Sequence, residues 1–293
     1  MAKKIHNPPL KKHTTFRIGG KPRLYVRPAD EQQLRQALEA IRDRSISFRV
    51  LGGGSNLLID DGPLPFAVLH MCSPGFSWIK RSGKNTLRVG AGVRLGKLLS
   101  SAQKDSLGGL EFLAGIPGTL GGAIAGNAGA WGSDISERIS RVWTMTPDGE
   151  YQELSPSEMN FGYRTCDVRD FIITEAELEL EPRSPELIAR AVAQNAQKKG
   201  KRHPTGNPSA GCVFKNPPTR SAGKLIDLCG LKGSRVGGAE ISPVHANFIC
   251  NMAQASSRDV IQLIETVKNI VRESFGVELE LELKHWPGQS KVA

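Results

Sequence analysis

Two glycine-rich segments are the residues of this sequence best suited to binding an anion. They are LGGGSNLLIDDG, residues 51–62, and AGIPGTLGGAIAGNAGAWG, residues 114–132. Because glycine has no Cβ, such loops can take positive φ and bring several backbone N–H donors close to a phosphate. For any single glycine a tight turn or close packing is the commoner explanation. Two dense clusters nevertheless favour a cradle for a phosphorylated ligand.

Other familiar ligand motifs are absent from the sequence. There is no G-x-x-x-x-G-K-[ST], and GAGVRLG at residues 90–96 has one residue too many for the dinucleotide-binding fingerprint. The six histidines form no H-x-x-H or H-E-x-x-H pattern, so we expect no metal ion. The five cysteines include no C-x-x-C pair, and their odd number favours free thiols.

Charge and hydropathy limit the class of protein further. The chain has 293 residues and a formal charge of +10, which suits either a nucleic acid or small anionic ligands. Only 6% of residues are aromatic, and none lies in the basic cluster KKGKRH, residues 198–203, to stack on a base. No uncharged apolar run approaches the roughly 18 residues of a membrane span, and no apolar segment follows the basic N-terminus. We expect a cytoplasmic protein with no membrane partner.

Periodicity predicts the elements that must position these loops. Helices are expected over residues 31–43 and 95–104, from Pro185 to just before Gly200, in AGKLIDLCG (residues 222–230, closed by Gly230), and from near Ser256 to Gly276. RVWTMT and YQEL flank Pro147-Asp148-Gly149 and are predicted to form a hairpin. FIITEAELEL, residues 171–180, is expected to be a strand with one face in water. VELELEL, residues 277–283, alternates strictly and is also predicted to be a strand.

Six segments in this order carry a family resemblance: TTFRIGG, LGGGSNLL, AGIPGTLGGAIAGNAGAWG, FGYRT, PSAGCVFKNP and VELELEL. Together they resemble the UDP-N-acetylenolpyruvoylglucosamine reductases, flavoenzymes of bacterial peptidoglycan synthesis. The resemblance runs from about residue 14 to the C-terminus. The chain lacks the tyrosine-bearing insertion of the longer members and is similar to the shorter, type II form.

The resemblance implies an α+β fold. A two-part FAD-binding region of the vanillyl-alcohol-oxidase/PCMH type would precede a C-terminal α+β substrate domain. The expected boundaries are 1–68 for the first FAD-binding subdomain, 69–202 for the second, and 203–276 for the substrate domain. A C-terminal strand within 277–293 is expected to return to the second subdomain.

The resemblance also implies the reaction and the partners. NADPH would reduce bound FAD, and reduced FAD would deliver hydride to the enolpyruvyl ether of a UDP-sugar, giving UDP-N-acetylmuramate. The expected cofactors are therefore FAD and NADPH. The chain is expected to act as a monomer and to bind no nucleic acid.

Three residues occupy the catalytic positions that the resemblance implies. Arg164 offers a planar fork for a carboxylate, although without the resemblance a surface arginine is as good an interpretation. Glu282 would help to stabilise the enolate, whereas pattern alone makes it one of three solvated glutamates. Cys212 stands where the family usually has serine as proton donor, and a thiol can serve as the acid. A small buried cysteine is its alternative fate.

The remaining candidate residues are assigned to binding. Asn216 and Lys215 match family positions near the UDP portion, and Arg202 is a candidate for the diphosphate. The candidate FAD-binding residues, working mainly through backbone amides, are Gly52, Gly53, Gly54, Ser55, Asn56, Leu57, Gly115, Ile116, Pro117, Gly118, Thr119, Gly121 and Gly122.

Two other functions remain open from the sequence. A flavoprotein of the same fold that uses oxygen as acceptor is disfavoured by CVFKNP and VELELEL, which belong to the reductase's substrate domain. A basic nucleic-acid-binding protein would be colourless and would bind in a steeply salt-dependent way.

Overall fold

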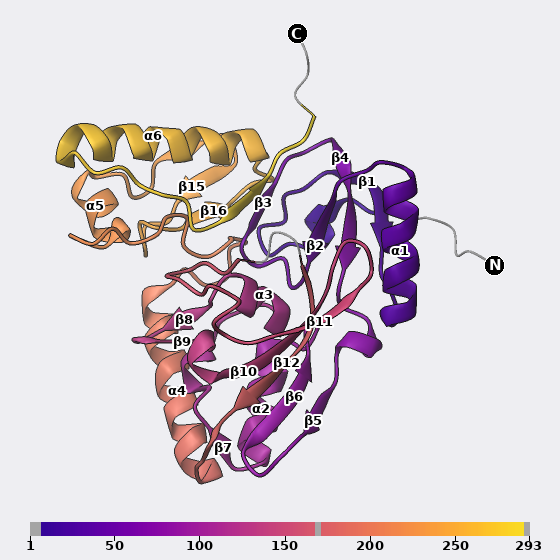
Figure 1. Cartoon of the computed structure of the whole chain (residues 1–293). Helices are drawn as coiled ribbons and strands as arrows, with labels where there is room; N and C mark the ends of the chain where they lie inside the picture. Colours follow the sequence, from indigo (N-terminus) through magenta and orange to yellow (C-terminus); the bar gives the residue numbers. More distant parts are fainter. Residues whose placement is uncertain (1–6, 168–170, 290–293) are drawn as a thin grey trace. The chain divides into compact units, whose positions relative to one another are not determined.

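The computed structural model describes residues 7–167 and 171–289, which form two compact units built from separated stretches of the chain (Figure 1). Unit 1 comprises Met1–Arg23, Gly54–Pro65 and Gly200–Ala293, and unit 2 comprises Leu24–Gly53 and Phe66–Lys199. The chain therefore passes between the units several times, once inside the first glycine-rich segment, after Gly53. The expected three-part division of the chain stays a prediction.

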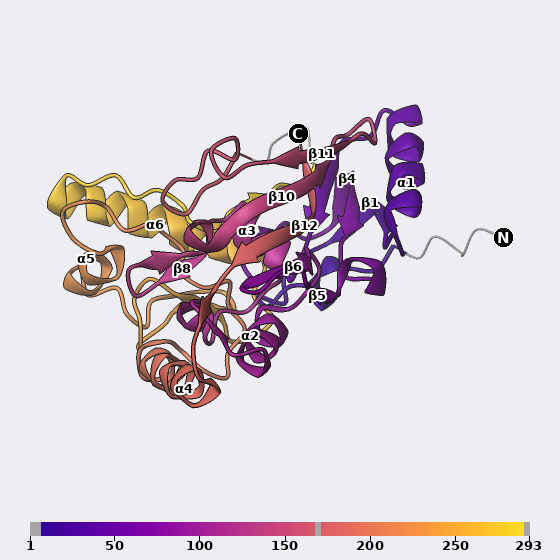
Figure 2. The ribbon, with the colours of Figure 1, turned by 60° about the horizontal axis from the view of Figure 1, so that its bottom comes forward.

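A five-stranded antiparallel sheet forms the centre of unit 2, with its strands side by side in Figures 1 and 2. Its order is β11-β10-β12-β6-β5, from β5 (Ile79–Arg81), β6 (Thr86–Gly90), β10 (Ile139–Met145), β11 (Tyr151–Leu154) and β12 (Ile172–Glu179). One face buries Leu87, Val142 and Leu178 in a core with apolar residues of α2 (Leu95–Lys104) and α3 (Leu120–Ala125). This core fixes the start of α3 and the glycine-rich segment before it.

A smaller sheet in the order β1-β4-β2 packs on α1 (Glu31–Asp43). Its strands are β1 (Lys21–Val26), β2 (Phe48–Leu51) and β4 (Pro63–His70), and the parallel register of β2 and β4 pairs Leu51 with His70. The first glycine-rich loop therefore leaves the sheet at the carboxyl end of β2. The other elements that begin in unit 2 are the pairs β7 (Leu107–Gly108) with β13 (Glu181–Pro182) and β8 (Gly129–Ala130) with β9 (Ser133–Asp134), helix α4 (Pro185–Arg202), and the 3-10 turns η2 (Pro74–Phe76), η3 (Glu111–Leu113) and η4 (Ile135–Arg138).

Unit 1 has its own core, in which apolar residues of α6 (Ser257–Phe275) meet Phe16, Leu58 and Phe214. An antiparallel sheet in the order β14-β15-β16 and a parallel pair of β17 with β3 complete it. Its further elements are η1 (Leu10–Lys12), β3 (Leu57–Ile59), α5 (Ala222–Leu228), β14 (Arg235–Val236), β15 (Ala239–Ile241), β16 (Ile249–Asn251) and β17 (Lys284–Trp286). Among the helices of residues 7–167 and 171–289, none is both long and apolar enough to cross a bilayer.

Several predicted elements are confirmed with their bounds. Helices α1 and α2 cover residues 31–43 and 95–104, and β10 and β11 form the expected hairpin. Helix α6 begins after its N-cap Ser256 and ends at Gly276, which takes φ of 66°. The sequence predicts these elements well because their apolar period, caps and turn residues all agree.

Three predicted features are wrong in detail. Helix α4 does not end before Gly200 but continues to Arg202, since a glycine within a helix is tolerated at a cost of about 1 kcal/mol. Residues 277–283 contain no strand, only an isolated bridge from Phe214 to Leu281, and the regular strand is β17. The alternate residues Leu279 and Leu283 are nevertheless buried.

The third correction concerns β12, whose polar face is not in water at Glu175. That side chain is 5% exposed and accepts hydrogen bonds from Arg88 and from the Tyr151 hydroxyl. A buried carboxylate is stable only when it is paired in this way, and its partners come from β6 and β11. Burial in turn raises the pKa of Tyr151.

The start of α6 gives a pH-dependent prediction. The Ser256 backbone N–H, followed by the Gly238 N–H, holds the pKa of Asp259 below its ordinary value. The carboxylate therefore stabilises the fold above the unfolded pKa of about 3.9, and this stability is lost as pH falls through the folded pKa. Replacing Asp259 with Asn should lower the free energy of unfolding at pH 7.

Urea unfolding of the wild type and Asp259→Asn between pH 7 and pH 2.5 tests this. The difference between the two should shrink below about pH 4. Glu273→Gln is the control on the same helix, because the exposed Glu273 carboxylate contacts no charged or polar group of the described chain, and it should change little. A difference that stays constant with pH would contradict the assigned role of Asp259.

Candidate active site

The two glycine-rich segments approach each other closely within unit 2. A Cβ on Gly53 would lie 2.6 Å from Gly118 Cα, and one on Gly52 would lie 2.6 Å from Thr119 Oγ1. Real Cβ atoms do not tolerate such distances, so both positions require glycine for space. The loop after β2 and the loop before α3 thus form one cradle, whose use for a cofactor stays a prediction.

This cradle contains donors that the protein itself does not satisfy. Thr119 is 5% exposed, and its hydroxyl has no hydrogen-bond partner within the described chain. The backbone N–H groups of Gly115 and Gly118, both at positive φ, also donate to none of the described residues. A buried unsatisfied hydroxyl needs an explanation, and a bound ligand with phosphate oxygens supplies one.

Not every amide in the second segment is available. The N–H of Ile116 donates to Leu113 O and that of Gly121 to Ala91 O, so these two residues shape the loop through internal bonds. Pro117 lies in the loop, whereas Gly122 lies in the first turn of α3, where a Cβ would meet Thr119 Oγ1 at 3.6 Å. Donors for a ligand therefore concentrate around Gly115, Gly118 and Thr119.

The remaining part of the first segment lies in unit 1. Gly54 takes φ of 63°, and a Cβ there would lie 2.0 Å from His13 O, so only glycine fits. Its carbonyl accepts from the Thr15 N–H at 3.0 Å, which connects it to the TTFRIGG segment. Ser55 is half-buried, and Leu57 begins β3, which pairs with β17.

Asn56 connects this segment to the C-terminal part of the chain. Its side-chain Nδ2 donates to Glu282 O at 3.1 Å, and its carbonyl accepts from Lys284 N at 3.0 Å. Two residues more than 220 positions apart in sequence are thereby brought side by side. A predicted flavin-loop residue and a predicted catalytic glutamate consequently belong to one hydrogen-bonded assembly in unit 1.

The segment with Cys212 pairs with the segment with Glu282. Val213 O accepts from Glu282 N at 2.8 Å, and Lys215 N donates to Glu280 O at 2.9 Å. With the bridge from Phe214 to Leu281, these bonds give an antiparallel pairing of residues 213–215 with 280–282. Cys212 is half-buried, is not in a disulfide with any described cysteine, and adjoins this pairing. The structure therefore brings the segments that carry Cys212 and Glu282 together.

Asn247, which no motif in the sequence marks, forms hydrogen bonds to residues 213 and 214 of this pairing. It is 2% exposed; its Nδ2 donates to Phe214 O at 2.8 Å, and its Oδ1 accepts from Phe214 N at 2.9 Å. Its own carbonyl accepts from Val213 N at 2.8 Å. The only sequence signal for this role was a polar amide within the otherwise apolar run ANFIC, because a buried amide needs hydrogen-bond partners.

Arg164 belongs to unit 2 and is held there by backbone carbonyls. Its guanidinium donates to Gly129 O at 2.6 Å and to Asn127 O at 3.4 Å. The residue itself takes φ of 57° in a tight turn in which Gly162 and Thr165 exchange two backbone hydrogen bonds. An ordinary surface arginine would not need a strained backbone and fixed acceptors.

The three candidate binding residues are placed differently. Asn216 is exposed, and its Oδ1 accepts from Ala222 N at the start of α5. Lys215 Nζ lies 3.5 Å from Glu280 Oε2. Arg202 is the last residue of α4. Burial is the main cause that lowers the pKa of His245, and the positive charges of Lys232 and Arg202 lower it further.

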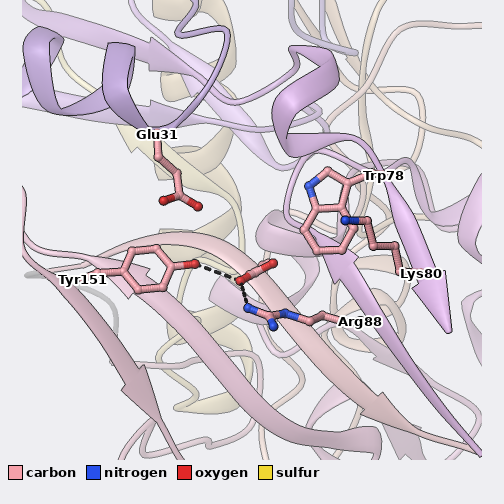
Figure 3. A pocket seen from close by; sticks show the side chains of 6 residues that line it. Glu31, Trp78, Lys80, Arg88 and Tyr151 are labelled. Atoms are coloured by element: carbon pink, nitrogen blue, oxygen red, sulfur yellow. Dashed lines mark hydrogen bonds and ion pairs between the residues drawn. The ribbon is translucent and has the colours of Figure 1, made fainter. Parts of the chain in front are cut away.

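A separate open pocket of about 420 Å³ lies on the sheet face of unit 2 opposite the core with α2 and α3. In Figure 3, Tyr151 and Arg88 point toward one carboxylate, which belongs to Glu175, while Lys80 lies over the Trp78 ring. The Arg88 guanidinium also stacks on Trp143 at 3.9 Å. None of the sequence-predicted site residues lines this pocket, so we assign its contacts to the stability of the sheet.

Comparison with known proteins bears directly on the identity of the chain. A model described as "FAD binding domain" matches residues 22–155, and one for the C-terminal domain of UDP-N-acetylenolpyruvoylglucosamine reductase matches residues 203–286. The reductase of that name from Desulforamulus reducens is 41% identical over 280 residues, covering 95% of this chain and 92% of that protein. The chain belongs to the UDP-N-acetylenolpyruvoylglucosamine reductase family.

Further relatives agree with this membership. The UDP-N-acetylenolpyruvoylglucosamine reductase of Bacillus subtilis is 36% identical over 287 residues, covering 97% of this chain and 94% of that one. The crystal structure of the Thermus caldophilus reductase matches with a TM-score of 0.85 and 37% identity, covering 97% of this chain and 99% of that one. The α+β fold with an FAD-binding domain and a reductase C-terminal domain is thereby confirmed. This reductase is an FAD-containing oxidoreductase of peptidoglycan synthesis.

The cradle in unit 2 gives a direct test of flavin binding. Gly53→Ala places a Cβ against backbone rather than a flexible side chain, so the loop must shift. We expect FAD affinity to fall by about tenfold or more, measured from the flavin absorbance retained after gel filtration.

Gly96→Ala is the matched control. Gly96 lies in α2, and a Cβ there meets nothing within 4 Å, so the variant should keep its flavin. Full retention of FAD by Gly53→Ala would show that the close approach of the two loops is not needed for binding.

Proposed function

We propose that this reductase uses NADPH to reduce UDP-N-acetylglucosamine enolpyruvate to UDP-N-acetylmuramate. The observation that supports this most directly is the pairing in unit 1 of the Cys212 and Glu282 segments, joined by Asn56 to the first glycine-rich segment. A proton donor, a carboxyl group and a flavin-loop residue are thus parts of one assembly. The names of the relatives describe the same substrate.

The donors of Gly115, Gly118 and Thr119 would hold FAD, which when bound would supply the hydride transfer from NADPH to the β-carbon of the enolpyruvyl group. The protein must then manage the charge that develops on the α-carbon and its carboxylate. Arg164 has a fixed planar fork whose backbone acceptors hold it in one orientation, so it suits the substrate carboxylate. Glu282 assists by a hydrogen bond at the developing enolate.

Cys212 completes the reaction as a general acid. Its Sγ–H gives a proton to the α-carbon, a C–H bond forms, and the S–H bond breaks to leave a thiolate that regains its proton from water. One hydride and one proton then account for the two hydrogens added across the double bond. The position of Cys212 next to the segment that pairs with Glu282 supports this assignment.

The substrate's UDP portion is assigned to unit 1 residues near α5. Asn216 keeps its Oδ1 on Ala222 N, so its Nδ2 is the donor for a ligand. Lys215 would exchange its contact with Glu280 for a phosphate, and Arg202 adds a second positive charge. We further propose that the protein works as a cytoplasmic monomer and that residues 1–68, 69–202 and 203–276 serve as its three functional parts.

Variants at Cys212 test the mechanism by separating its two halves. Cys212→Ala should still have its flavin bleached by NADPH under anaerobic conditions, but re-oxidation by the enolpyruvyl substrate should slow by roughly 10²- to 10⁴-fold. Cys212→Ser keeps an O–H donor and should retain measurable turnover. Stopped-flow absorbance of the flavin band measures both halves.

Two outcomes would contradict the proposal at different points. Re-oxidation of Cys212→Ala at the wild-type rate would remove the thiol from the mechanism. Failure of the wild type itself to re-oxidise with this substrate would remove the substrate assignment.

A further inference from the structure

Asn127 is buried and takes a left-handed backbone conformation, which is uncommon for a residue with a side chain. It follows Gly126, the C-cap of α3, is 2% exposed, and takes φ of 40°. Asparagine is among the few residues with a Cβ that adopt this left-handed region readily. A glycine would fit the backbone without strain, so the side chain has another purpose here.

The Asn127 side chain uses both ends of its amide. Its Nδ2 donates to Gly162 O at 3.0 Å, across 35 residues, and its Oδ1 accepts from Ser136 N at 3.3 Å. Gly162 is the first residue of the tight turn that it closes with Thr165, and Arg164 lies inside that turn. The amide therefore connects the end of α3 to the turn that carries Arg164.

The backbone of the same residue reaches the Arg164 side chain. Asn127 O accepts from one guanidinium nitrogen of Arg164 at 3.4 Å, and Gly129 O, two residues on, accepts from the other at 2.6 Å. Asn127 thus fixes the turn through its side chain and the guanidinium through its carbonyl. Both contacts are made with residue 127 in the left-handed conformation.

We propose that Asn127 is a positioning residue for Arg164, holding its guanidinium in the orientation needed to bind the substrate carboxylate. This inference rests on the proposed function of Arg164. A planar bidentate donor is sensitive to orientation, and a displacement of about 1 Å can reduce a rate by roughly 10²-fold. Asn127 itself touches no reacting atom.

Asn127→Gly removes the amide while keeping the backbone conformation and the carbonyl. Re-oxidation of the NADPH-reduced flavin by UDP-N-acetylglucosamine enolpyruvate should slow roughly 10- to 100-fold at saturating substrate. Flavin bleaching by NADPH should change by less than about twofold, because it does not use Arg164. Equal slowing of both halves, or no slowing of either, would overturn the proposal.

A matched control separates positioning from general loss of stability. Asn195 Nδ2 also donates to a distant backbone carbonyl, Glu111 O, at 3.0 Å in unit 2. Asn195→Ala should lower the melting temperature in the same way but leave re-oxidation unchanged. Amide hydrogen exchange of the peptide covering residues 161–165 should accelerate in Asn127→Gly and not in Asn195→Ala, a readout independent of activity.

A double variant tests whether Asn127 acts through Arg164. In an Arg164→Ala background, Asn127→Gly should cause no further slowing of re-oxidation, since there is no guanidinium left to orient. Additive effects would show that Asn127 acts independently and would overturn the proposal. Re-oxidation of the wild type by the substrate, measured alongside, shows separately whether the proposed function holds.

Asn127→Asp provides a second variant, which keeps the shape of the side chain. Aspartate tolerates the left-handed conformation and can accept from Ser136 N, but its carboxylate cannot donate to Gly162 O. The same selective loss of re-oxidation is expected. A wild-type rate in Asn127→Asp would show that the bond to Gly162 does not position Arg164.

Discussion

The antiparallel pairing between residues 213–215 and 280–282 is the interaction on which the rest of the proposed site depends. Glu282 N and Lys215 N make its hydrogen bonds, at 2.8 and 2.9 Å, and the buried Asn247 holds it from behind. These segments are about 65 residues apart in sequence. Without this pairing, the segment of the candidate acid Cys212 and the segment of the candidate carboxyl group of Glu282 would not be fixed relative to each other. In unit 1, backbone hydrogen bonds therefore fix the segments from which the candidate side chains project.

Unit 2 uses the same principle with different residues. The positive φ of Gly115 and Gly118 and the absence of Cβ atoms at Gly52 and Gly53 let two loops meet around an unsatisfied Thr119 hydroxyl. Two backbone carbonyls, Gly129 O and Asn127 O, accept hydrogen bonds from the Arg164 guanidinium. The core that covers one face of the five-stranded sheet fixes the second of these loops. The excess of glycine in the sequence thus has a local physical cause.

Sequence reasoning succeeded where a signal is local. Helix α6 carries an apolar stripe, an N-cap at Ser256 and a left-handed Gly276, and all three agree. It was wrong at VELELEL because alternation does not show whether a partner strand is present; only Leu281 forms a bridge. Burial of Glu175 was also hidden, since Arg88 lies 87 residues away in sequence. The sequence does not mark Asn127 or Asn247, because a single buried amide produces no periodic pattern.

The central claim is that Cys212 and Glu282 act together on one carbon of the substrate. The most direct test is a double-mutant cycle of Cys212→Ala and Glu282→Gln on the rate of flavin re-oxidation by UDP-N-acetylglucosamine enolpyruvate. Residues that act as a unit give non-additive losses, so the double variant should be scarcely slower than the slower single variant. Losses that multiply would contradict the account, because they would show that the two residues act independently.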